Sequence, residues 1–269
     1  MPSVDADPRW RDIADNSYSN SFQAGFDYAN ATAVLRYEET GSTFTGSFIA
    51  DGLKPNFAYQ MKFRAGHDSP GMERLGYLGR WWFGGNPLNV SDAYYEAHKT
   101  DPICSSFMLF DYFATDSNGH IEKPIAIDST YHVLWRYGIS GVPGVMLPSA
   151  NDGPSLQTLV DPVTGSAYDV DHDPHLVSVF GEYEHTAGSV RPLPGQLVMP
   201  DGYYELEFVL TEESFHSSGG LGGWWSEAMV SPTGEAVRFT IDRSAGVPEP
   251  ASLALLFLSM TPLLRRRRR

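Results

Sequence analysis

The sequence of 269 residues predicts an all-β sandwich that carries a long insertion and ends in a short apolar segment. Several segments alternate apolar and polar residues with a period of two, which is typical of strands. The 26 glycines and 19 prolines are spread as turn residues rather than gathered in a linker. Helical periodicity is weak throughout. We therefore expect one body over residues 1–245, with an insertion near 64–103, and a tail over residues 246–269.

Alternation is clearest in residues 59–64, 204–210 and 237–241, where apolar side chains face one way and polar side chains the other. This pattern is typical of a strand with one buried and one solvated face. Phe107–Phe113 is apolar on both faces and predicts a central strand that is covered on both sides. Further strands are expected near residues 33–37, 44–49, 131–137 and 176–183.

The stretch between Arg64 and Ile103 is too long for an ordinary sandwich loop. We expect it to carry its own structure and to lie over one end of the sandwich. One short helix is expected there from Ser91 to Lys99, with Ser91 or Asp92 as the N-cap.

The segment Leu53-Lys54-Pro55-Asn56-Phe57-Ala58-Tyr59 has the pattern Leu-x-Pro-x-x-x-Tyr ahead of a strand. It resembles the tyrosine corner of fibronectin type III and related immunoglobulin-like sandwiches, in which the tyrosine hydroxyl bonds back to the backbone. Met199–Tyr203 has a similar turn followed by a strand. The body is thus expected to be an immunoglobulin-like or jelly-roll-like sandwich, and the lack of a linker favours one sandwich over two in tandem.

The chain is acidic, with 33 Asp and Glu against 19 Lys and Arg and a net charge of −14. Without the five arginines at its end, 14 basic residues remain against 33 acidic ones, a net charge of −19. Such a body repels phosphate backbones, which argues against nucleic-acid binding. The single cysteine, Cys104, excludes an intrachain disulfide and a thiolate metal cluster, and we expect it to be buried and unreactive.

The tail has three parts in sequence: Val247-Pro248-Glu249-Pro250, the apolar segment 251–264, and the arginines 265–269. Each proline lacks an N–H, so the first part is expected to be an extended, accessible spacer. As a short helix, the 14 residues of the apolar segment would span roughly 21 Å, less than a hydrocarbon core of about 30 Å. The arginines would stay on the cytoplasmic side of a membrane.

This order of parts resembles the PEP-CTERM sorting signal of Gram-negative bacteria. The resemblance implies that an exosortase, a membrane transpeptidase, recognises and cuts the tail. It also implies export to the cell surface or extracellular matrix, with a structural or adhesive role in exopolysaccharide or biofilm. The residues that would form the sorting signal are Val247, Pro248, Glu249, Pro250, Arg265, Arg266, Arg267, Arg268 and Arg269.

The alternative for the tail is an ordinary C-terminal membrane anchor or a basic tail.

Exported proteins with a PEP-CTERM signal need an N-terminal signal peptide, and Met1–Pro8 has neither a basic n-region nor an apolar h-region. We therefore expect the true start of the protein to lie upstream of Met1.

Candidate carbohydrate-binding residues are Trp81, Trp82, Trp224 and Trp225. Exposed aromatic rings stack on the C–H faces of sugars, which would suit a protein that lives in polysaccharide. The alternative is that these rings fill the core, as large aromatic side chains do by default. Adjacent residues of a strand point to opposite faces, so at most one tryptophan of each pair is expected to be exposed.

A candidate metal site lies in the run from Asp169 to His175, where Asp169, Asp171 and Asp173 could converge on Ca²⁺. The run departs from an EF-hand loop, with Pro174 where glycine is required and Phe180 where glutamate is required. The histidines of the run could instead serve a transition metal. The alternative is a solvated acidic turn.

No catalytic residue is assigned from the sequence. A glycoside hydrolase needs two carboxylates across a cleft, and the candidates are Glu182, Glu184, Glu205, Glu207, Glu212 and Glu213. Glutamates that alternate along strands are ordinarily on the solvent face. The sequence contains no nucleophile elbow, zinc-protease motif or phosphate-binding loop. The first alternative to a structural or adhesive protein is therefore a carbohydrate- or calcium-binding β-sandwich module, and the second is a polysaccharide-degrading hydrolase.

Overall fold

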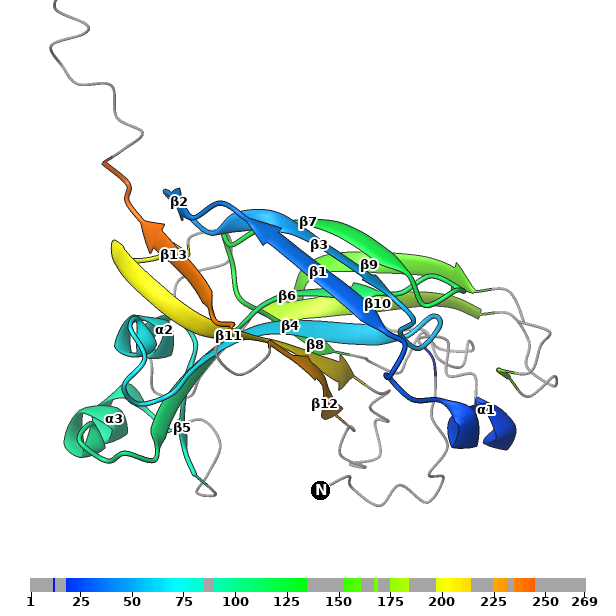
Figure 1. Ribbon diagram of the computed structural model, residues 1–269, viewed down its shortest axis with the longest axis horizontal. Helices are drawn as coiled ribbons and strands as arrows, with labels where there is room; N and C mark the ends of the chain where they lie inside the picture. The colour runs from blue at the N-terminus through cyan, green and yellow to red at the C-terminus, as the bar shows by residue number, and fades with distance from the viewer. Residues whose placement is uncertain are drawn as a thin grey trace, which may run out of the picture.

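The computed structural model describes residues 12, 18–84, 90–134, 152–160, 167–168, 175–183, 197–213, 225–231 and 235–244. Within these ranges the chain forms thirteen strands and three short helices. The predicted all-β class is confirmed, because strands arranged in three sheets dominate the described residues (Figure 1).

The largest sheet has seven strands in the order β2-β13-β11-β4-β6-β5, with β12 beside β11. Every pairing in it is antiparallel except that of β13 with β2, which is parallel. Its strands are β2 (Thr40–Gly41), β13 (Val237–Ile241), β11 (Gly202–Glu213), β4 (Ala58–Ala65), β6 (Cys104–Ala114), β5 (Arg80–Phe83) and β12 (Trp225–Val230). The three segments with the clearest alternation are thus the strands β4, β11 and β13.

Two three-stranded antiparallel sheets complete the described fold. One has the order β1-β3-β7, with β1 (Thr32–Tyr37), β3 (Thr45–Asp51) and β7 (Ile121–Ala126). The other has the order β8-β10-β9, with β8 (Tyr131–Leu134), β10 (His175–Tyr183) and β9 (Asp152–Val160). The strands expected near 33–37, 44–49 and 176–183 are confirmed, and β8 covers the described part of the one expected at 131–137.

Aromatic side chains join the β1-β3-β7 sheet to one face of the seven-stranded sheet. The ring of Phe44, just before β3, lies 5.0 Å from that of Phe63 on β4 and 4.8 Å from that of Phe239 on β13. Phe48 of β3 lies 5.7 Å from Phe113 of β6. All five rings are buried. Burial of each such side chain contributes about 1.5–3 kcal/mol, so this contact between two sheets forms the centre of the core.

The strand β6 is buried on both faces over much of its length, as its apolar sequence predicts. Phe110 and Phe113 lie in the core, and Leu109 and Tyr112 are buried as well. A bulge interrupts the register of the strand: Met61 of β4 pairs with Asp111 and the next residue pairs with Leu109, so Phe110 is an extra residue. The strand β8 lies against β4 and β6 and contributes to the cover.

The insertion at 64–103 folds as two short helices around one strand (Figure 1). The helix α2 (Met72–Leu78) precedes β5, and α3 (Asp92–His98) follows it. The expected helix and its cap are confirmed, because the Ser91 hydroxyl accepts the N–H of Tyr94 at 3.2 Å. The insertion also extends the large sheet, since β5 pairs with β6 as its edge strand. A third helix, α1 (Asn20–Gly25), precedes β1.

Two tyrosines bond back to the backbone where their strands begin. The Tyr59 hydroxyl accepts the N–H of Lys54 at 2.9 Å, which confirms the bond expected of the corner motif. The Tyr204 hydroxyl donates to the carbonyl of Pro200 at 2.8 Å. Both tyrosines follow a proline by four residues, and both are fully buried. The strands that they begin, β4 and β11, are antiparallel neighbours, so the two corners stand at opposite ends of this central pair.

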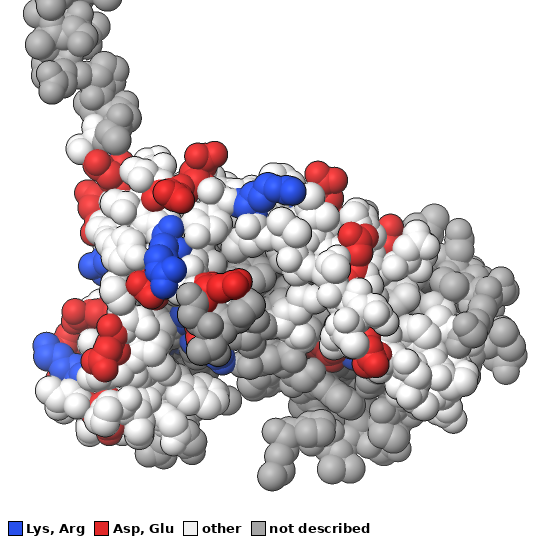
Figure 2. Space-filling model, in the orientation of Figure 1, with Lys and Arg blue, Asp and Glu red and all other residues white. Residues whose placement is uncertain are grey.

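Among the charged side chains on one face of the molecule, acidic ones predominate. On the face shown in Figure 2, Asp and Glu are scattered over the described strands and helices, with Lys and Arg at few positions between them. Within the described ranges, no helix is long and apolar enough to cross a membrane.

We predict that Tyr59→Phe lowers the free energy of unfolding by about 1–3 kcal/mol, because it leaves the buried N–H of Lys54 without an acceptor. Urea unfolding followed by tryptophan fluorescence measures the change. Tyr203→Phe is the matched control, since Tyr203 is 43% exposed and its hydroxyl bonds to the side chain of Glu205. Equal urea midpoints for the two variants would contradict the structural role of the corner.

Candidate functional site

The structure separates the four candidate tryptophans. Trp81 is fully buried, and Trp82 is half-buried. Trp225 begins β12, but the structure describes only its backbone. Other candidates fall outside the described residues, namely Trp224, Asp169, Asp171, Asp173 and the sorting residues 247–250 and 265–269.

Trp81 belongs to the core and offers no face to a ligand. Its ring stacks on that of Tyr95 of α3, with centroids 3.6 Å apart and planes 2° from parallel. Its Nε1 donates to Asp92 Oδ1 at 2.7 Å, which satisfies the indole N–H. The side chain points from β5 toward the insertion helices, so the core interpretation holds for Trp81. Of the pair Trp81 and Trp82, Trp82 stays the candidate for stacking on a sugar.

The seven-stranded sheet has one face that carries Phe63 and an opposite face that carries Trp82. The face that carries Trp82 is called the outer face below. The Trp82 ring meets that of Phe107 edge-on, with centroids 6.5 Å apart. The strand register then places four residues in one row across four strands, because directly opposite residues share a face. The row consists of Arg80, Phe107, Arg64 and Glu207.

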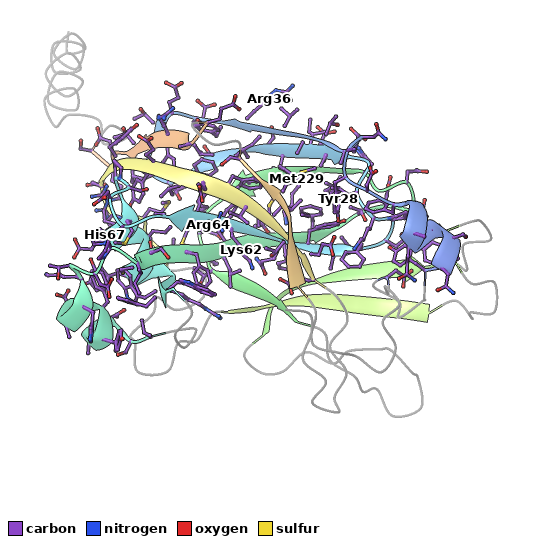
Figure 3. All side chains as sticks on the ribbon, turned by 60° about the horizontal axis from the view of Figure 1, so that its bottom comes forward. Tyr28, Arg36, Lys62, Arg64, His67 and Met229 are labelled. Atoms are coloured by element: carbon purple, nitrogen blue, oxygen red, sulfur yellow. The ribbon has the colours of Figure 1, made fainter. Side chains whose placement is uncertain are left out.

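An ion pair ends this row, since Arg64 Nε lies 2.7 Å from Glu207 Oε2. A second pair lies further along the same face, with Arg238 2.9 Å from Glu205. Lys62 precedes Arg64 by two residues on β4 and therefore shares the face (Figure 3). The outer face thus combines two aromatic rings with cations and carboxylates held on rigid strands.

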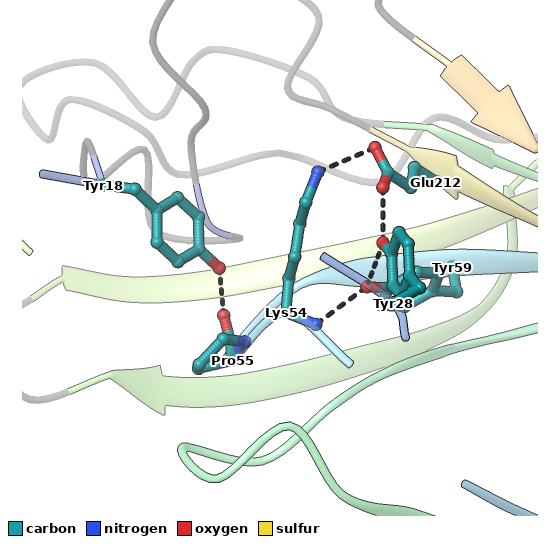
Figure 4. Close-up of polar contacts among 6 residues, drawn as sticks. All are labelled: Tyr18, Tyr28, Lys54, Pro55, Tyr59 and Glu212. Carbon is teal, nitrogen blue, oxygen red and sulfur yellow. Dashed lines mark hydrogen bonds and ion pairs between the residues drawn. The ribbon is translucent and has the colours of Figure 1, made fainter. Parts of the chain in front are cut away.

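A different cluster of charge is buried at the tyrosine corner (Figure 4). Lys54 Nζ lies 2.8 Å from Glu212 Oε2, and the two side chains are only 2% and 6% exposed. Tyr28 donates its hydroxyl to Glu212 Oε1 and lies 3.1 Å from the hydroxyl of Tyr59. Because Tyr28 has one proton and gives it to Glu212, Tyr59 donates to Tyr28. The bonds form a closed ring that starts at the backbone N–H of Lys54 and ends at its ammonium group.

Burial sets the protonation of this ring. Burial lowers the pKa of Lys54, against the charge of Glu212, which acts to raise it. Burial also raises the pKa of Tyr28 and of Tyr59 far above that of a free tyrosine. The Phe57 ring lies 4.8 Å from Lys54 Nζ and adds a cation–π contact. Both hydroxyls thus stay protonated, and neither tyrosine is a reactive group.

Three of the six glutamates considered for a hydrolase form ion pairs with cations. The cation is Arg238 for Glu205, Arg64 for Glu207 and Lys54 for Glu212. The hydrogen bond from Arg238 lowers the pKa of Glu205, whereas a general acid needs a raised pKa.

One described carboxyl with a pKa raised by burial is Asp111, and it lies 2.7 Å from Lys123 of β7. This ion pair joins the two sheets of the core.

Cys104 is buried, as expected, with 1% of its surface exposed. Burial raises the pKa of its thiol to about 11, which keeps it protonated and unreactive near neutral pH. Among the residues that the structure describes, no group of three or more His, Cys, Asp or Glu side chains is placed to hold a metal ion.

No protein-family model matches the chain, and neither the curated proteins nor the solved structures contain a match.

The sequence alone could not reveal the Lys54–Glu212 pair, because its members are 158 positions apart. The corner motif was the available indication, since it places Lys54 between Leu53 and Tyr59, which are both buried. The row on the outer face was also missed, although Glu207 was a candidate carboxylate, because cross-strand register is not visible in one sequence.

We predict that Lys54→Met and Glu212→Gln each lower the free energy of unfolding by about 3–5 kcal/mol, because each leaves a buried charge unpaired. The double variant should lose much less than the sum of the two. Urea unfolding of the four proteins gives the coupling energy. The exposed pair Lys99–Glu96, 3.1 Å apart on α3, is the control and should show no measurable coupling. Additive losses at Lys54 and Glu212 would contradict the closed ring.

We predict that Gly76→Ala destabilises the protein by about 1–3 kcal/mol through overpacking, although alanine favours a helix by about 1 kcal/mol. A Cβ at Gly76 of α2 would overlap the Trp81 ring. Gly25→Ala in α1 is the control, since its Cβ would meet nothing within 4 Å. Thermal unfolding compares them, and a Gly76→Ala protein as stable as wild type would argue against the packing of Trp81.

Proposed function

We propose that this chain is an exported protein of a Gram-negative-type bacterium that serves a structural or adhesive role at the cell surface or in the extracellular polysaccharide matrix. The observation that carries the proposal is the tail, with Val247-Pro248-Glu249-Pro250, a short apolar segment and five arginines in that order. Its partner would be an exosortase-type membrane transpeptidase. After cleavage, the body would remain in the envelope, on the outer surface or in the matrix.

Each part of the tail has a physical role in this proposal. The five arginines are attracted to the anionic cytoplasmic leaflet and fix the orientation of the tail. The apolar segment 251–264 would form a short helix that enters the bilayer from that side. The proline-bounded spacer cannot continue this helix, so it would stay extended and accessible where the enzyme cuts.

The body is proposed to be an immunoglobulin-like or jelly-roll-like sandwich. Support comes from the aromatic contact between the β1-β3-β7 sheet and the seven-stranded sheet, and from the corner bond of Tyr59. A scaffold with one cysteine must gain its stability from such packing. That requirement is consistent with a protein that supports or links other molecules.

We predict that the tail is removed only when an exosortase is present and the Pro-Glu-Pro spacer is intact. The gene, placed behind a secretion signal peptide, would be expressed in a host with an exosortase and in the same host without it. Intact-mass spectrometry of the surface fraction should show a chain that ends before the apolar segment.

The variant with Pro248, Glu249 and Pro250 all changed to alanine should keep its arginines and stay in the membrane fraction. A variant with three alanines at residues 257–259, within the apolar segment, controls for the number of substitutions. Release of the processed chain from the host without an exosortase would refute the proposal, as would intact arginines on the surface protein.

A further inference from the structure

We propose that Lys54 and Glu212 become joined in the folded chain by an amide bond between Lys54 Nζ and Glu212 Cδ. The ion pair at the tyrosine corner is the arrangement from which this bond forms. The inference depends on residues of the body alone, so it holds whether or not the tail is sorted. The bond turns the contact between the first corner and the end of β11 into a covalent link.

The first support is the position of the two reacting groups. Lys54 Nζ lies 2.8 Å from Glu212 Oε2, and the two side chains are 2% and 6% exposed. The backbone N–H of Lys54 is bonded to Tyr59 as well, so both ends of the lysine are held in place. Groups held in this way react with effective concentrations that reach about 10⁵–10⁸ M. The fold thus brings together an amine and a carboxyl group that are 158 positions apart in the chain.

The second support is the apolar surroundings of the lysine. The rings of Phe57 and Phe26 lie 4.8 Å and 6.0 Å from Lys54 Nζ. Burial lowers the pKa of Lys54, which favours the neutral amine that can attack a carbonyl carbon. Transfer of one proton from Nζ to Oε2 removes both buried charges at once, and low polarity favours this neutral form of the pair.

The third support is that the two carboxylate oxygens of Glu212 have different partners (Figure 4). Oε2 accepts a hydrogen bond from Lys54 Nζ, and Oε1 accepts one from the Tyr28 hydroxyl. A donor at Oε1 stabilises the negative charge that this oxygen carries when Cδ is attacked. Burial holds the pKa of Tyr28 far above that of a free tyrosine, so its hydroxyl keeps its proton and acts as the donor.

The reaction needs only the groups of this pair. A first proton passes from Nζ to Oε2, and the neutral Nζ then attacks Cδ and forms the C–N bond. A second proton moves from Nζ to Oε2, the Cδ–Oε2 bond breaks, and Oε2 leaves as water. The nitrogen keeps its third proton as the amide N–H, and Oε1 becomes the amide oxygen. Atoms and charges therefore balance without an oxidant or another reactant.

The bond would serve the purpose that disulfides serve in many exported proteins. The chain has one cysteine and cannot form a disulfide within itself. A cross-link over 158 positions closes a long loop, and links of this kind restrict the unfolded chain most strongly. An amide is not cleaved by thiols, so the link would persist in reducing and oxidising surroundings alike.

Two other ion pairs of lysine and carboxylate are internal controls. Lys123 Nζ lies 2.7 Å from Asp111, with the two side chains 28% and 16% exposed. Lys99 Nζ lies 3.1 Å from Glu96 on the surface of α3. Water reaches both pairs and solvates their charged forms. We expect both to remain ion pairs, although the distances are similar.

The test is the mass of the full-length chain, expressed without an exosortase, purified in non-ionic detergent and then denatured. We expect a deficit of one water molecule from the mass that the sequence requires, and a proteolytic digest should contain a branched peptide that joins Lys54 to Glu212. Dehydration of an aspartate also removes water, but it gives no branched peptide. A full mass would overturn the proposal, as would a deficit without this branched peptide or a link at either control pair.

Unfolded chain tests whether the fold drives the reaction. Chain recovered from inclusion bodies in urea, where the pair is not assembled, should have the full mass and should lose water after refolding. A branched peptide in chain that is kept in urea would contradict the proposal, because proximity in the fold is its basis.

Substitutions separate the amide bond from the ion pair. Lys54→Arg keeps the positive charge, but a guanidinium does not attack a carboxyl carbon, so this variant should keep its full mass. Tyr28→Phe should slow the loss of water after refolding about 10²-fold, by removal of the donor to Oε1. Tyr203→Phe, at a hydroxyl that is exposed, is the matched control. Equal rates for the two tyrosine variants would contradict the reaction path, and the mass of the wild-type chain decides the proposal even if a variant does not fold.

Discussion

The centre of this fold depends on a partner for the buried charge of Glu212. An unpaired carboxylate at that depth would be costly, and Lys54 balances it from the turn before the neighbouring strand. Because Lys54 also donates its backbone N–H to Tyr59, one residue ties the corner, the ion pair and the tyrosine pair together. The helix α1 and the segment after it are joined to the sheets through Tyr28 of the same ring. A segment near the N-terminus, the first corner and the end of β11 are therefore held by one set of bonds.

The features predicted from the sequence are those that local rules control. Alternation indicated β4, β11 and β13, because a strand with one wet face must alternate. The cap at Ser91 and the bond of Tyr59 followed from motifs that span a few residues. The type of sandwich and the function of the tail stay predictions.

The elements that were missed break those local rules. The strands β7 and β9 contain Pro124 and Pro154, and both are edge strands, where proline is tolerated. The helix α2 contains Gly76, a poor helix former that is needed to leave space for Trp81. Trp82 was a candidate from composition, but Phe107, whose ring it meets, comes from the neighbouring strand. Their association depends on register, which is a property of the assembled sheet.

The parallel pairing of β13 with β2 bears on how a pull on the tail would be transmitted to the fold. β13 is the last described strand before the tail, so a pull on the tail would meet the bonds of Arg243 to Asp201 before it reaches Ile241. There β13 lies between the start of β11 and the two-residue β2, and Asp242 adds a bond to Gly41. Tension along β13 would shear several hydrogen bonds at once instead of opening them singly. Tyr204, stacked on Phe239 at the other side of this junction, would pass the force into the aromatic interior.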